Sequence, residues 1–316
     1  MMVKKQEQFD LIGDIHGHAS KLVELLEHLD YRETSTGFAH PSRRAIFLGD
    51  FIDGADDLGE HRQLLDMIMA MVDNEHALAV MANHEFNALA YHTEDPENPG
   101  EHLRRRTEQR QKQHQAFLIE YDQPDSQKEK QKVLDFFYRL PLWIEHDGFR
   151  VVHACWSQKH IDYLSERLID RRLTPKLLEL ASRHCSDEFE AVEIILKGIE
   201  TSIEDLHFHD KRGIRRTAMR VQWWKPAAQT LDEVKMPDHL DLKHIADRPV
   251  PAGVPVYPAS EKPCFIGHYW LNGEPAPIAT NVACLDYSVA RGGKLVAYRW
   301  DGERVLRRGK FVYVDD

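Results

Sequence analysis

Seven short runs of mostly apolar residues along the chain have the length of β-strands. Their near-continuous apolar character is typical of strands that are covered on both faces. We predict that these runs form the central sheets, and they lie at residues 8–13, 45–49, 77–82, 149–154, 263–267, 281–286 and 294–300.

Two amphipathic helices are predicted between the first three runs, over residues 20–29 and 58–72. Ser20 is a candidate N-cap of the first helix. Alternating strands and helices indicate crossover connections and a largely parallel sheet. The apolar positions that share one face are Leu22, Leu25, Leu26 and Leu29 in the first helix, and Leu64, Leu65, Ile68 and Val72 in the second.

Two long polar segments interrupt this pattern, and we interpret both as excursions from a single domain that spans residues 1–316. Residues 92–135, rich in Gln, Glu, Lys and Arg, are predicted to form exposed helices with a turn near "DQPDS" (122–126). Residues 156–262 are predicted to hold several helices and then a Pro-rich irregular stretch at 247–260.

The composition is that of a globular protein rather than of a disordered or membrane chain. Of 316 residues, 42% are hydrophobic and 29% are charged. The longest pure apolar run in the helical region, "MIMAMV" (67–72), is far shorter than the roughly 18 residues of a membrane span. No apolar segment follows the lysines of the N-terminus, so no secretory signal is expected. We expect a cytoplasmic protein without a membrane partner.

Charge and rarer residue types narrow the range of partners. A formal net charge of −11 disfavours binding to bulk nucleic acid but is compatible with a small or locally docked phosphate group. The four cysteines lack CxxC spacing and are expected to be free thiols. Most of the 19 histidines, including His102, His114 and His160, fall in polar helical segments, where we expect solvated side chains.

Polar side chains follow five of the predicted strands, at the point where each strand ends. In an open α/β sheet, groups beyond the carboxyl ends of the strands converge on a crevice where ligands collect. Carboxylate, imidazole and amide groups together suit divalent manganese, iron or zinc. In chain order the groups are Asp14 and His16, Asp50 and Asp53, Asn83 and His84, His153, and His268.

The spacing of these groups predicts a centre with two metal ions. Asp14 and His16 are two residues apart at a strand end, so their side chains point to the same side and one ion can bind both. Asp50 is the candidate bridging carboxylate, because two cations about 3.5–4 Å apart need a shared anion. The second ion would take Asn83, His153 and His268.

Each of these groups, taken alone, has a plainer interpretation. A single Gly-Asp after a strand is usually a turn, and a single strand-end histidine is usually a buried structural residue. However, each buried polar group without a partner costs roughly 1–3 kcal/mol, whereas one shared metal centre would satisfy all of them. Five such occurrences in this order favour the metal centre.

Five sequence blocks carry these residues: "GDIHG" (13–17), "GDFIDG" (49–54), "ANHE" (82–85), "VVHA" (151–154) and "IGH" (266–268). In this order they resemble the blocks of the calcineurin-like metallophosphoesterases, which are GDxHG, GDxxDRG, GNHE, a strand-end His and a later GH. The resemblance is to the branch that contains Ser/Thr protein phosphatases and bacterial diadenosine tetraphosphatases. The ending "TNVACLDYSVARGGKLVAYRWDGE" (280–303) is similar to the closing strands of that branch.

The resemblance implies an α/β (α+β) fold, in which a β-sandwich of two mixed sheets is flanked by helices in four layers. The helical insertions would lie at about 92–135 and 156–262. It also implies two divalent metal ions, with manganese preferred over iron and zinc. By position, the first ion would bind Asp14, His16 and Asp50, and the second would bind Asp50, Asn83, His153 and His268.

The resemblance and general chemistry together predict the mechanism. A water that bridges two divalent cations has a lowered pKa, so hydroxide is available near neutral pH to attack phosphorus. His84 is predicted to be the general acid that protonates the leaving oxygen, oriented by Asp53. Many relatives outside this branch have a second histidine at the position of Trp270. The absence of that histidine matches the protein phosphatase branch.

Two positions depart from the family pattern. Gly54 stands where relatives have an arginine that clamps phosphate, and Ala82 replaces the glycine of GNHE, with little effect expected. The candidate replacement for the arginine is "KRGIRRTAMRVQWWK" (211–225), with six basic residues and no acidic one. Arg216 and Arg220, on one face of a predicted helix, are the candidate phosphate contacts. A solvated helix face backed by a packed Trp pair is the alternative.

The expected function is metal-dependent hydrolysis of phosphate esters, similar to that of Ser/Thr protein phosphatases, with a phosphoprotein or a nucleotide as substrate. A bis(5'-nucleosyl)-tetraphosphatase or another small-molecule phosphohydrolase is an alternative. A non-catalytic interaction module is a second alternative, favoured by the missing arginine and opposed by the complete ligand set. A polynucleotide-end phosphatase would share the fold but is disfavoured by the acidic net charge. The oligomeric state is left open.

Overall fold

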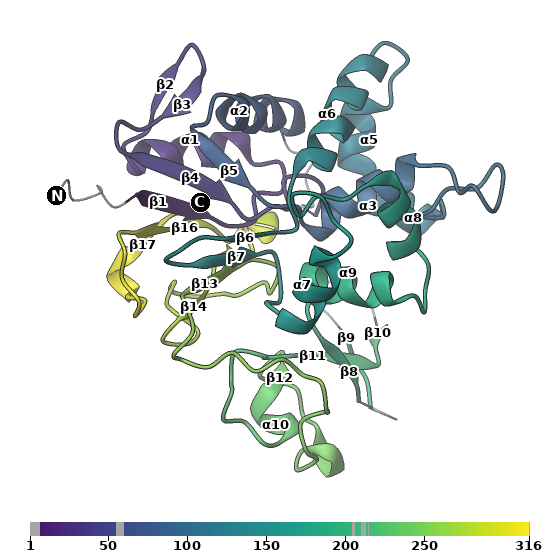
Figure 1. Ribbon diagram of the computed structural model, residues 1–316, viewed down its shortest axis with the longest axis vertical. Coiled ribbons are helices and arrows are strands. Elements are labelled where there is room, and N and C mark those ends of the chain that lie inside the picture. The colour runs from purple at the N-terminus through teal and green to yellow at the C-terminus, as the bar shows by residue number, and fades with distance from the viewer. Residues whose placement is uncertain (1–6, 55–59, 204–205, 210–212, 214, 316) are drawn as a thin grey trace.

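The computed structural model describes residues 7–54, 60–203, 206–209, 213 and 215–315. At its centre, two mixed β-sheets pack face to face, and helices cover both outer faces of this sandwich (Figure 1). The predicted fold class is therefore confirmed.

The larger sheet has six strands: β1 (Gln8–Ile12), β4 (Arg43–Phe47), β5 (Ala77–Ala79), β15 (Asp286–Tyr287), β16 (Lys294–Trp300) and β17 (Phe311–Val314). β1, β4 and β5 are parallel neighbours, and β16 pairs antiparallel with β1, β15 and β17. The parallel pairing is made by two crossover helices, α1 (Ala19–His28) and α2 (His61–Asp73).

The smaller sheet has four strands in the order β14-β13-β7-β6: β14 (Val282–Cys284), β13 (Cys264–Ile266), β7 (Arg150–Val152) and β6 (Trp143–Glu145). Only β6 is antiparallel to its neighbour. Each of the seven predicted apolar runs contains or overlaps a strand of one of the two sheets. A separate hairpin, β2 (Arg32–Thr34) and β3 (Gly37–Ala39), precedes β4.

Alternation along the strands builds two hydrophobic layers. On β1, Phe9 and Leu11 point into the interface between the sheets, where they join Phe149 and Phe265 of the smaller sheet. Ile12 points the other way, into the cluster that the sheet forms with the surrounding helices. Because both faces of β1 are covered, its sequence is apolar almost throughout.

Helix α1 begins at Ala19 with His18 as its N-cap, so the predicted N-cap role of Ser20 is wrong. Ser20 lies in the first turn, where its backbone N–H and its hydroxyl donate to the carboxylate of Glu60 at 2.7 and 2.6 Å. A carboxylate suits this position, because the first backbone N–H groups of a helix have no partner within the helix.

The first polar segment follows α3 (Asn83–His92) and holds three helices among its described residues: α4 (Glu108–Gln113), α5 (Gln115–Tyr121) and α6 (Gln127–Arg139). The predicted turn at 122–126 connects α5 to α6. The expectation that these helices are exposed is wrong for one face, where Phe117, Tyr121, Phe136 and Phe137 are buried in the main core. Their spacing along α5 and α6 is that of a helical stripe.

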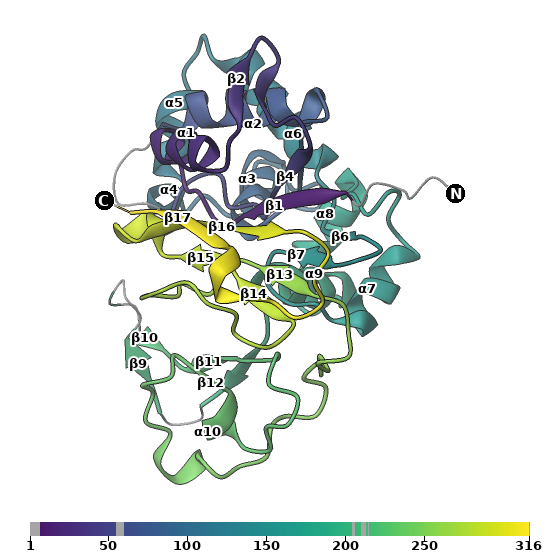
Figure 2. The same ribbon diagram turned by 90° about the vertical axis from the view of Figure 1, so that its left-hand side faces the viewer.

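The second polar segment begins with α7 (Gln158–Ser165), α8 (Pro175–Ala181) and α9 (Asp187–Lys197). α7 and α9 lie beside the smaller sheet, and α8 packs against α9 and α3 (Figure 1). A lobe with its own hydrophobic cluster follows, at the bottom of Figure 2. Its elements are β8 (Glu200–Ser202), β9 (Phe208–His209), β10 (Arg215–Arg216), β11 (Ala218–Val221), α10 (Leu231–Val234), β12 (Lys235–Met236) and the 3-10 turn η1 (Lys243–Ile245).

The helix predicted within 211–225 is wrong, because the described part of this stretch forms β10 and β11. β11 alternates buried Met219 and Val221 with half-buried neighbours, which is the period of a strand. The packed tryptophan pair is present, with Trp223 and Trp224 buried and their ring centroids 5.7 Å apart. Residues 211, 212 and 214 lie outside the described residues.

Two further expectations concern the whole chain. Cys155, Cys185, Cys264 and Cys284 are free thiols, as predicted. Within the described ranges, no helix combines the length and the apolar character required to cross a bilayer.

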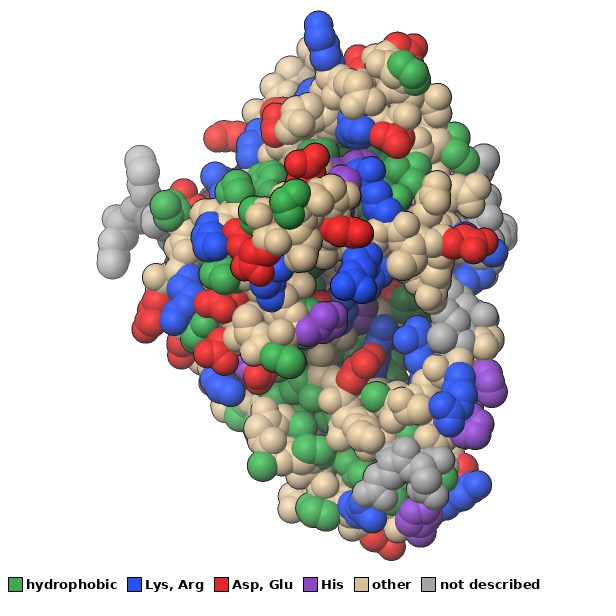
Figure 3. Space-filling model, turned by 90° about the vertical axis from the view of Figure 1, so that its right-hand side faces the viewer, with side chains coloured by type: hydrophobic (Ala, Val, Ile, Leu, Met, Phe, Trp, Pro, Cys, Tyr) green, Lys and Arg blue, Asp and Glu red, His purple; other side chains and the backbone are tan. Residues whose placement is uncertain are grey.

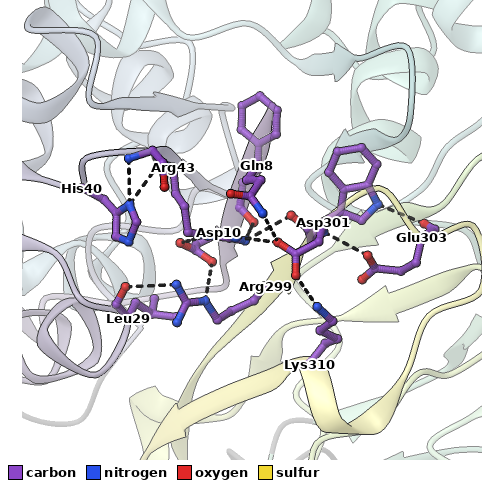
Figure 4. Close-up of polar contacts among 12 residues, drawn as sticks. Gln8, Asp10, Leu29, His40, Arg43, Arg299, Asp301, Glu303 and Lys310 are labelled. Carbon is purple, nitrogen blue, oxygen red and sulfur yellow. Dashed lines mark hydrogen bonds and ion pairs between the residues drawn. The ribbon is translucent and has the colours of Figure 1, made fainter. Parts of the chain in front are cut away.

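A buried ionic network fixes the ends of β1, β4 and β16 (Figure 4). Asp10, fully buried on β1, accepts a hydrogen bond from Arg43 Nε at 2.9 Å and lies 3.3 Å from Arg299 Nε. Arg43 also donates to Asp301, to which Lys310 is ion-paired. Burial raises the pKa of Asp10, and the two guanidinium groups oppose that rise.

We predict that Asp10→Ala lowers the free energy of unfolding by about 3 kcal/mol or more, because Arg43 then keeps a buried charge without its main partner. Urea denaturation measures this change. The control is Asp73→Ala, which removes an ion pair with Arg139 whose side chains are 44% and 52% exposed, and which should cost less than about 1 kcal/mol. Equal losses in the two variants would contradict the role of the network.

Candidate metal centre

The predicted metal-binding residues gather beyond the carboxyl ends of strands from both sheets. Potential ligand atoms of His16, Asp50 and His84 lie within 4.8 Å of one another, and so do those of Asp50, His153 and His268. Asp50 belongs to both groups, which is the position expected of a bridging carboxylate.

Asp14 and Asn83 complete the arrangement. Asp14 Oδ2 accepts a hydrogen bond from the backbone N–H of His268 at 3.0 Å. Asn83 Oδ1 lies 3.1 Å from His153 Nε2. The structure thus brings together the six residues that the sequence suggested as ligands, and their binding of metal stays a prediction.

Backbone carbonyl groups orient two of the histidines. His16 Nδ1 lies 2.9 Å from the carbonyl of Asp53, and His153 Nδ1 lies 2.8 Å from the carbonyl of Leu48. A carbonyl can only accept, so Nδ1 carries the proton in both rings and the lone pair is on Nε2. These Nε2 atoms face Asp50 Oδ2 at 3.8 and 3.4 Å, roughly the separation of two ligands on one ion with bonds of about 2.1 Å.

Several buried donor and acceptor atoms lack a hydrogen-bond partner within the described part of the chain. They include Asp14 Oδ1, His16 Nε2 and both ring nitrogens of His268. An unpaired buried polar atom costs about 1–3 kcal/mol, and the four atoms named here belong to three of the predicted ligands. Divalent cations would satisfy them, so the residues present fit a two-metal centre.

Negative charge accumulates in this site. Burial raises the pKa of Asp14 well above its ordinary value, and the neighbouring Asp286 carboxylate raises it further. Burial alone would also raise the pKa of Asp50, but His153 and His84 hold it well below its usual range. A divalent cation offsets such repulsion between buried carboxylates.

The pKa values of the two histidines of the second group are shifted in opposite directions. Burial alone would lower the pKa of His153, but the carboxylates of Asp50 and Asp14 raise it to about 10. Burial lowers the pKa of His268 well below its ordinary value, and the Arg220 cation adds to this effect. A lowered pKa favours the neutral imidazole that a metal ligand needs, whereas the raised pKa of His153 reflects the two carboxylates, whose charge a cation would offset.

Glu85 is a site residue that the sequence reasoning missed, although it lies in the block "ANHE". Its buried carboxylate accepts hydrogen bonds from the backbone N–H groups of Asp50 at 3.0 Å, Phe51 at 2.9 Å and Ala82 at 3.2 Å. Burial, and then the charge of Asp50, raises the pKa of Glu85 to about 7. Ala82 has an extended backbone with φ −114°, so its Cβ is tolerated there, as expected.

Four predicted site residues have positive φ angles, which are uncommon outside glycine: His16 (50°), Asp50 (49°), Asp53 (55°) and His268 (71°). A left-handed backbone turns the side chain away from the direction of the preceding strand. Such conformations persist only where the surroundings fix them, here through bonds such as that of Glu85 to Asp50.

Asp53 has a partner that the sequence reasoning missed. Its Oδ2 lies 2.6 Å from His114 Nδ1, and its Oδ1 accepts from the backbone N–H of Phe117 at 3.2 Å. Burial alone would raise the pKa of Asp53, but His114 holds it below its ordinary value. The expectation of a solvated side chain is wrong for His114, which is 6% exposed, and for His160, which is 5% exposed and bonded to Ser157.

The burial of His114 could have been inferred from a helical spacing of aromatic residues in the sequence. His114, Phe117 and Tyr121 are spaced by three and four residues, which places them on one face of α5. Their rings stack in that order, with centroids 4.8 and 4.7 Å apart. Two aromatic residues on the face of a histidine indicate a buried histidine.

The two predicted phosphate contacts lie on strands that are consecutive in the chain but belong to different sheets. Arg220 on β11 donates a hydrogen bond from Nη1 to the backbone carbonyl of His268 at 3.2 Å, so it borders the centre. Arg216 is exposed on β10, paired with Phe208 of β9. Their role in binding substrate stays a prediction.

The arginine of the family motif has no room at position 54. Gly54 has φ +84°, and a Cβ at this position would lie 2.4 Å from His16 Nδ1. Any side chain would therefore displace a predicted metal ligand. The close approach of His16 is the physical reason why glycine stands here.

The sequence profile of the calcineurin-like phosphoesterases matches residues 8–245, which is most of the chain. The chain belongs to this family. The expectation of a phosphoric ester hydrolase is confirmed at the level of the family.

Two curated relatives match a shorter part of this chain. Over 79 residues, this chain is 35% identical to the asymmetrical bis(5'-nucleosyl)-tetraphosphatase PrpE of Halalkalibacterium halodurans and 37% identical to that of Geobacillus sp.. The aligned segment covers 24% of this phosphoesterase in both cases and 30% and 31% of the relatives.

A solved structure supports the fold. A protein serine/threonine phosphatase from Saccharomyces cerevisiae aligns over 99% of this phosphoesterase and 80% of that chain, with a TM-score of 0.51 and 12% sequence identity. At this identity the likeness concerns the fold alone.

We predict that Asp50→Asn reduces bound manganese from two equivalents to less than one, because Asp50 is the residue common to both ligand groups. Metal analysis of protein dialysed against manganese measures the content. The matched control is Asp53→Asn, three residues away and equally buried, whose carboxylate contacts His114 and Phe117 instead. Two equivalents retained by the Asp50 variant would contradict the bridging role.

Proposed function

We propose that this protein hydrolyses phosphate esters at a two-metal centre. The main support is the position of Asp50, whose carboxylate is shared by two groups of potential ligands. Bound divalent cations would offset the charge of the phosphate and acidify a water molecule. The proposed ligands are Asp14, His16, Asp50, Asn83, His153 and His268, with manganese as the first metal to test.

His84 is the proposed general acid for the leaving oxygen. Its backbone N–H donates to Asp50 Oδ1 at 3.1 Å, and its ring meets that of His16 edge to face at 5.2 Å. The ring is half-buried rather than enclosed, so a substrate oxygen can reach it. This position suits proton transfer to a group leaving the centre.

Asp53 is proposed as the residue that positions His84. The two groups interact electrostatically, because His84 contributes to holding the pKa of Asp53 below its ordinary value. The carboxylate is fixed by His114 and by the N–H of Phe117, so its negative charge has a defined place beside the imidazole. A fixed carboxylate in this place would orient the imidazole as in an Asp–His pair.

Arg220, and more distantly Arg216, are proposed to bind substrate phosphate. The guanidinium group of Arg220 lies beside His268 and is half-buried. A cation at the border of the centre would neutralise phosphate oxygens that the metal ions do not bind.

A phosphoprotein and a small phosphate ester are both candidate substrates. The expected likeness to Ser/Thr phosphatases favours the former, and the two tetraphosphatase relatives favour a dinucleoside polyphosphate as the second candidate. The cytoplasmic location stays a prediction from the sequence.

We predict that His84→Asn keeps its metal content and lowers kcat by roughly 10²–10⁴-fold on an ester with a poor leaving group. On p-nitrophenyl phosphate, whose leaving group needs no proton, the loss should be far smaller. Steady-state kinetics with both substrates measures the ratio. Equal losses would exclude His84 as the proton donor.

The substrate class is tested with manganese-loaded wild-type protein and a panel of a phosphoserine peptide, diadenosine tetraphosphate and nucleoside monophosphates. The preferred class should show a kcat/KM at least about tenfold above the others. Absence of turnover on the whole panel and on p-nitrophenyl phosphate, with two metal ions bound, would contradict the proposed function and favour an interaction module.

A further inference from the structure

The Arg104 guanidinium group is held by side chains that are neighbours in the chain of two proposed site residues, His84 and His114. Arg104 lies in the segment between α3 and α4. The backbone N–H groups of Leu103 and Arg104 bond to the carbonyls of Thr93 and Ala90 at 3.0 and 2.9 Å, which fixes this segment against the end of α3.

Two neutral side chains hold the Arg104 guanidinium. Nη1 donates to Asn87 Oδ1 at 2.8 Å, and Nη2 donates to Gln113 Oε1 at 3.0 Å. Asn87 follows His84 by three residues on α3, so the two side chains share a face of this helix. Gln113 immediately precedes His114, the partner of Asp53. Arg104 is thus held between the two segments that carry the site residues.

The charge of Arg104 is not balanced by an adjacent carboxylate. Among the described residues, none has a carboxylate oxygen within 4.0 Å of its guanidinium nitrogens. Arg43, Arg150 and Arg183, in contrast, are each paired with two or more carboxylates. Two of its five N–H groups are used in the bonds to Asn87 and Gln113.

The surroundings oppose this positive charge. Burial, and then the neighbouring Arg110 cation, lowers the pKa of Arg104 to about 10, while Glu193 and Asp53 attract it at longer range. Basic side chains and histidines, interspersed with acidic ones, border a hollow on the face drawn in Figure 3. An anion bound to the remaining N–H groups of Arg104 would supply the missing negative charge, and phosphate accepts two parallel bonds from a guanidinium group.

We propose that Arg104 binds phosphate oxygens of the substrate, in place of the arginine that is absent at position 54, with Arg110 as a second cation behind it. The inference rests on the proposed phosphoesterase function. Arg110 precedes Gln113, the partner of Arg104, by three residues on α4, so the two side chains share a face of this helix. Two guanidinium groups in this arrangement suit a chain of several phosphates, so the site favours a dinucleoside polyphosphate over the single phosphate of a phosphopeptide.

Binding of inorganic phosphate to the manganese-loaded protein, measured by calorimetry, tests the role of Arg104. Arg104→Gln should raise the Kd by about tenfold or more, because a charge-assisted hydrogen bond is lost. Arg105→Gln is the matched control, since it removes the same charge from an exposed neighbour, and it should change the Kd by less than about twofold. Equal effects of the two variants, or no phosphate binding by the wild type, would overturn the inference.

A second variant tests the same inference in case Arg104→Gln does not fold. Asn87→Ala keeps the arginine but removes one of the two groups that hold it, and should weaken phosphate binding about threefold or more with an unchanged circular dichroism spectrum. If Arg104→Gln does not fold, an unchanged phosphate affinity in Asn87→Ala overturns the inference.

The phosphate measurement needs no turnover, so it separates the two proposals. Phosphate binding that depends on Arg104 in a protein without esterase activity would contradict the proposed function alone. Hydrolysis by the wild type with equal behaviour of Arg104→Gln and Arg105→Gln would contradict the inference alone. Arg110→Gln should lower kcat/KM more for diadenosine tetraphosphate than for a phosphoserine peptide, and equal losses would overturn the substrate preference.

Discussion

The arrangement of the site depends on the burial of one carboxylate, that of Asp50, between several imidazole groups. The backbone N–H of Asp50 donates a hydrogen bond to the carboxylate of Glu85, and Asp50 Oδ1 accepts a hydrogen bond from the backbone N–H of His84. His16 and His153 approach Oδ2 from the two sides. Two buried carboxylates so close together are costly unless cations and N–H groups surround them, so the local backbone, the imidazole tautomers and the proposed metal ions form one interdependent unit.

Packing of the two sheets is what assembles this unit. His16 and Asp50 follow strands of the larger sheet, whereas His153 and His268 follow β7 and β13 of the smaller one. Neither sheet carries both ligand groups, so the centre forms only when the apolar layer between the sheets is in place. The residues of that layer, including Phe9, Phe149 and Phe265, therefore contribute to the site without contacting it. Fold stability and site geometry are coupled for this reason.

The sequence alone predicted secondary structure and site residues correctly where the pattern that indicates them lies within one short segment. The strands were predicted because both faces are apolar, and their polar ends were recognised because motif and position agreed. Prediction failed where tertiary contacts decided the outcome. Ser20 looked like a helix N-cap until Glu60, forty residues away, was placed beside it. The stretch around Arg216 and Arg220 has helical spacing, but pairing with β8 and β9 makes it strand. His114 looked solvated because its partner, Asp53, lies 61 residues away.

The insertion between α3 and α6 forms hydrogen bonds to a proposed site residue, Asp53. Through His114 and the N–H of Phe117 it fixes Asp53, and through Glu120 it accepts the first backbone N–H groups of α2 at His61 and Arg62. His61 in turn accepts from the backbone N–H of Asp53. In this way the turn after β4 is held by α2 and by the insertion on its two sides. Gly54 in this turn lies in direct contact with His16, so the turn cannot carry the arginine of the family motif. Any further positive charge at the site must therefore come from another segment of the chain. The insertion is one segment that reaches this point, through His114 and Phe117, and Arg220 of β11 approaches the centre at His268. The proposed phosphate-binding arginines accordingly lie outside the motif.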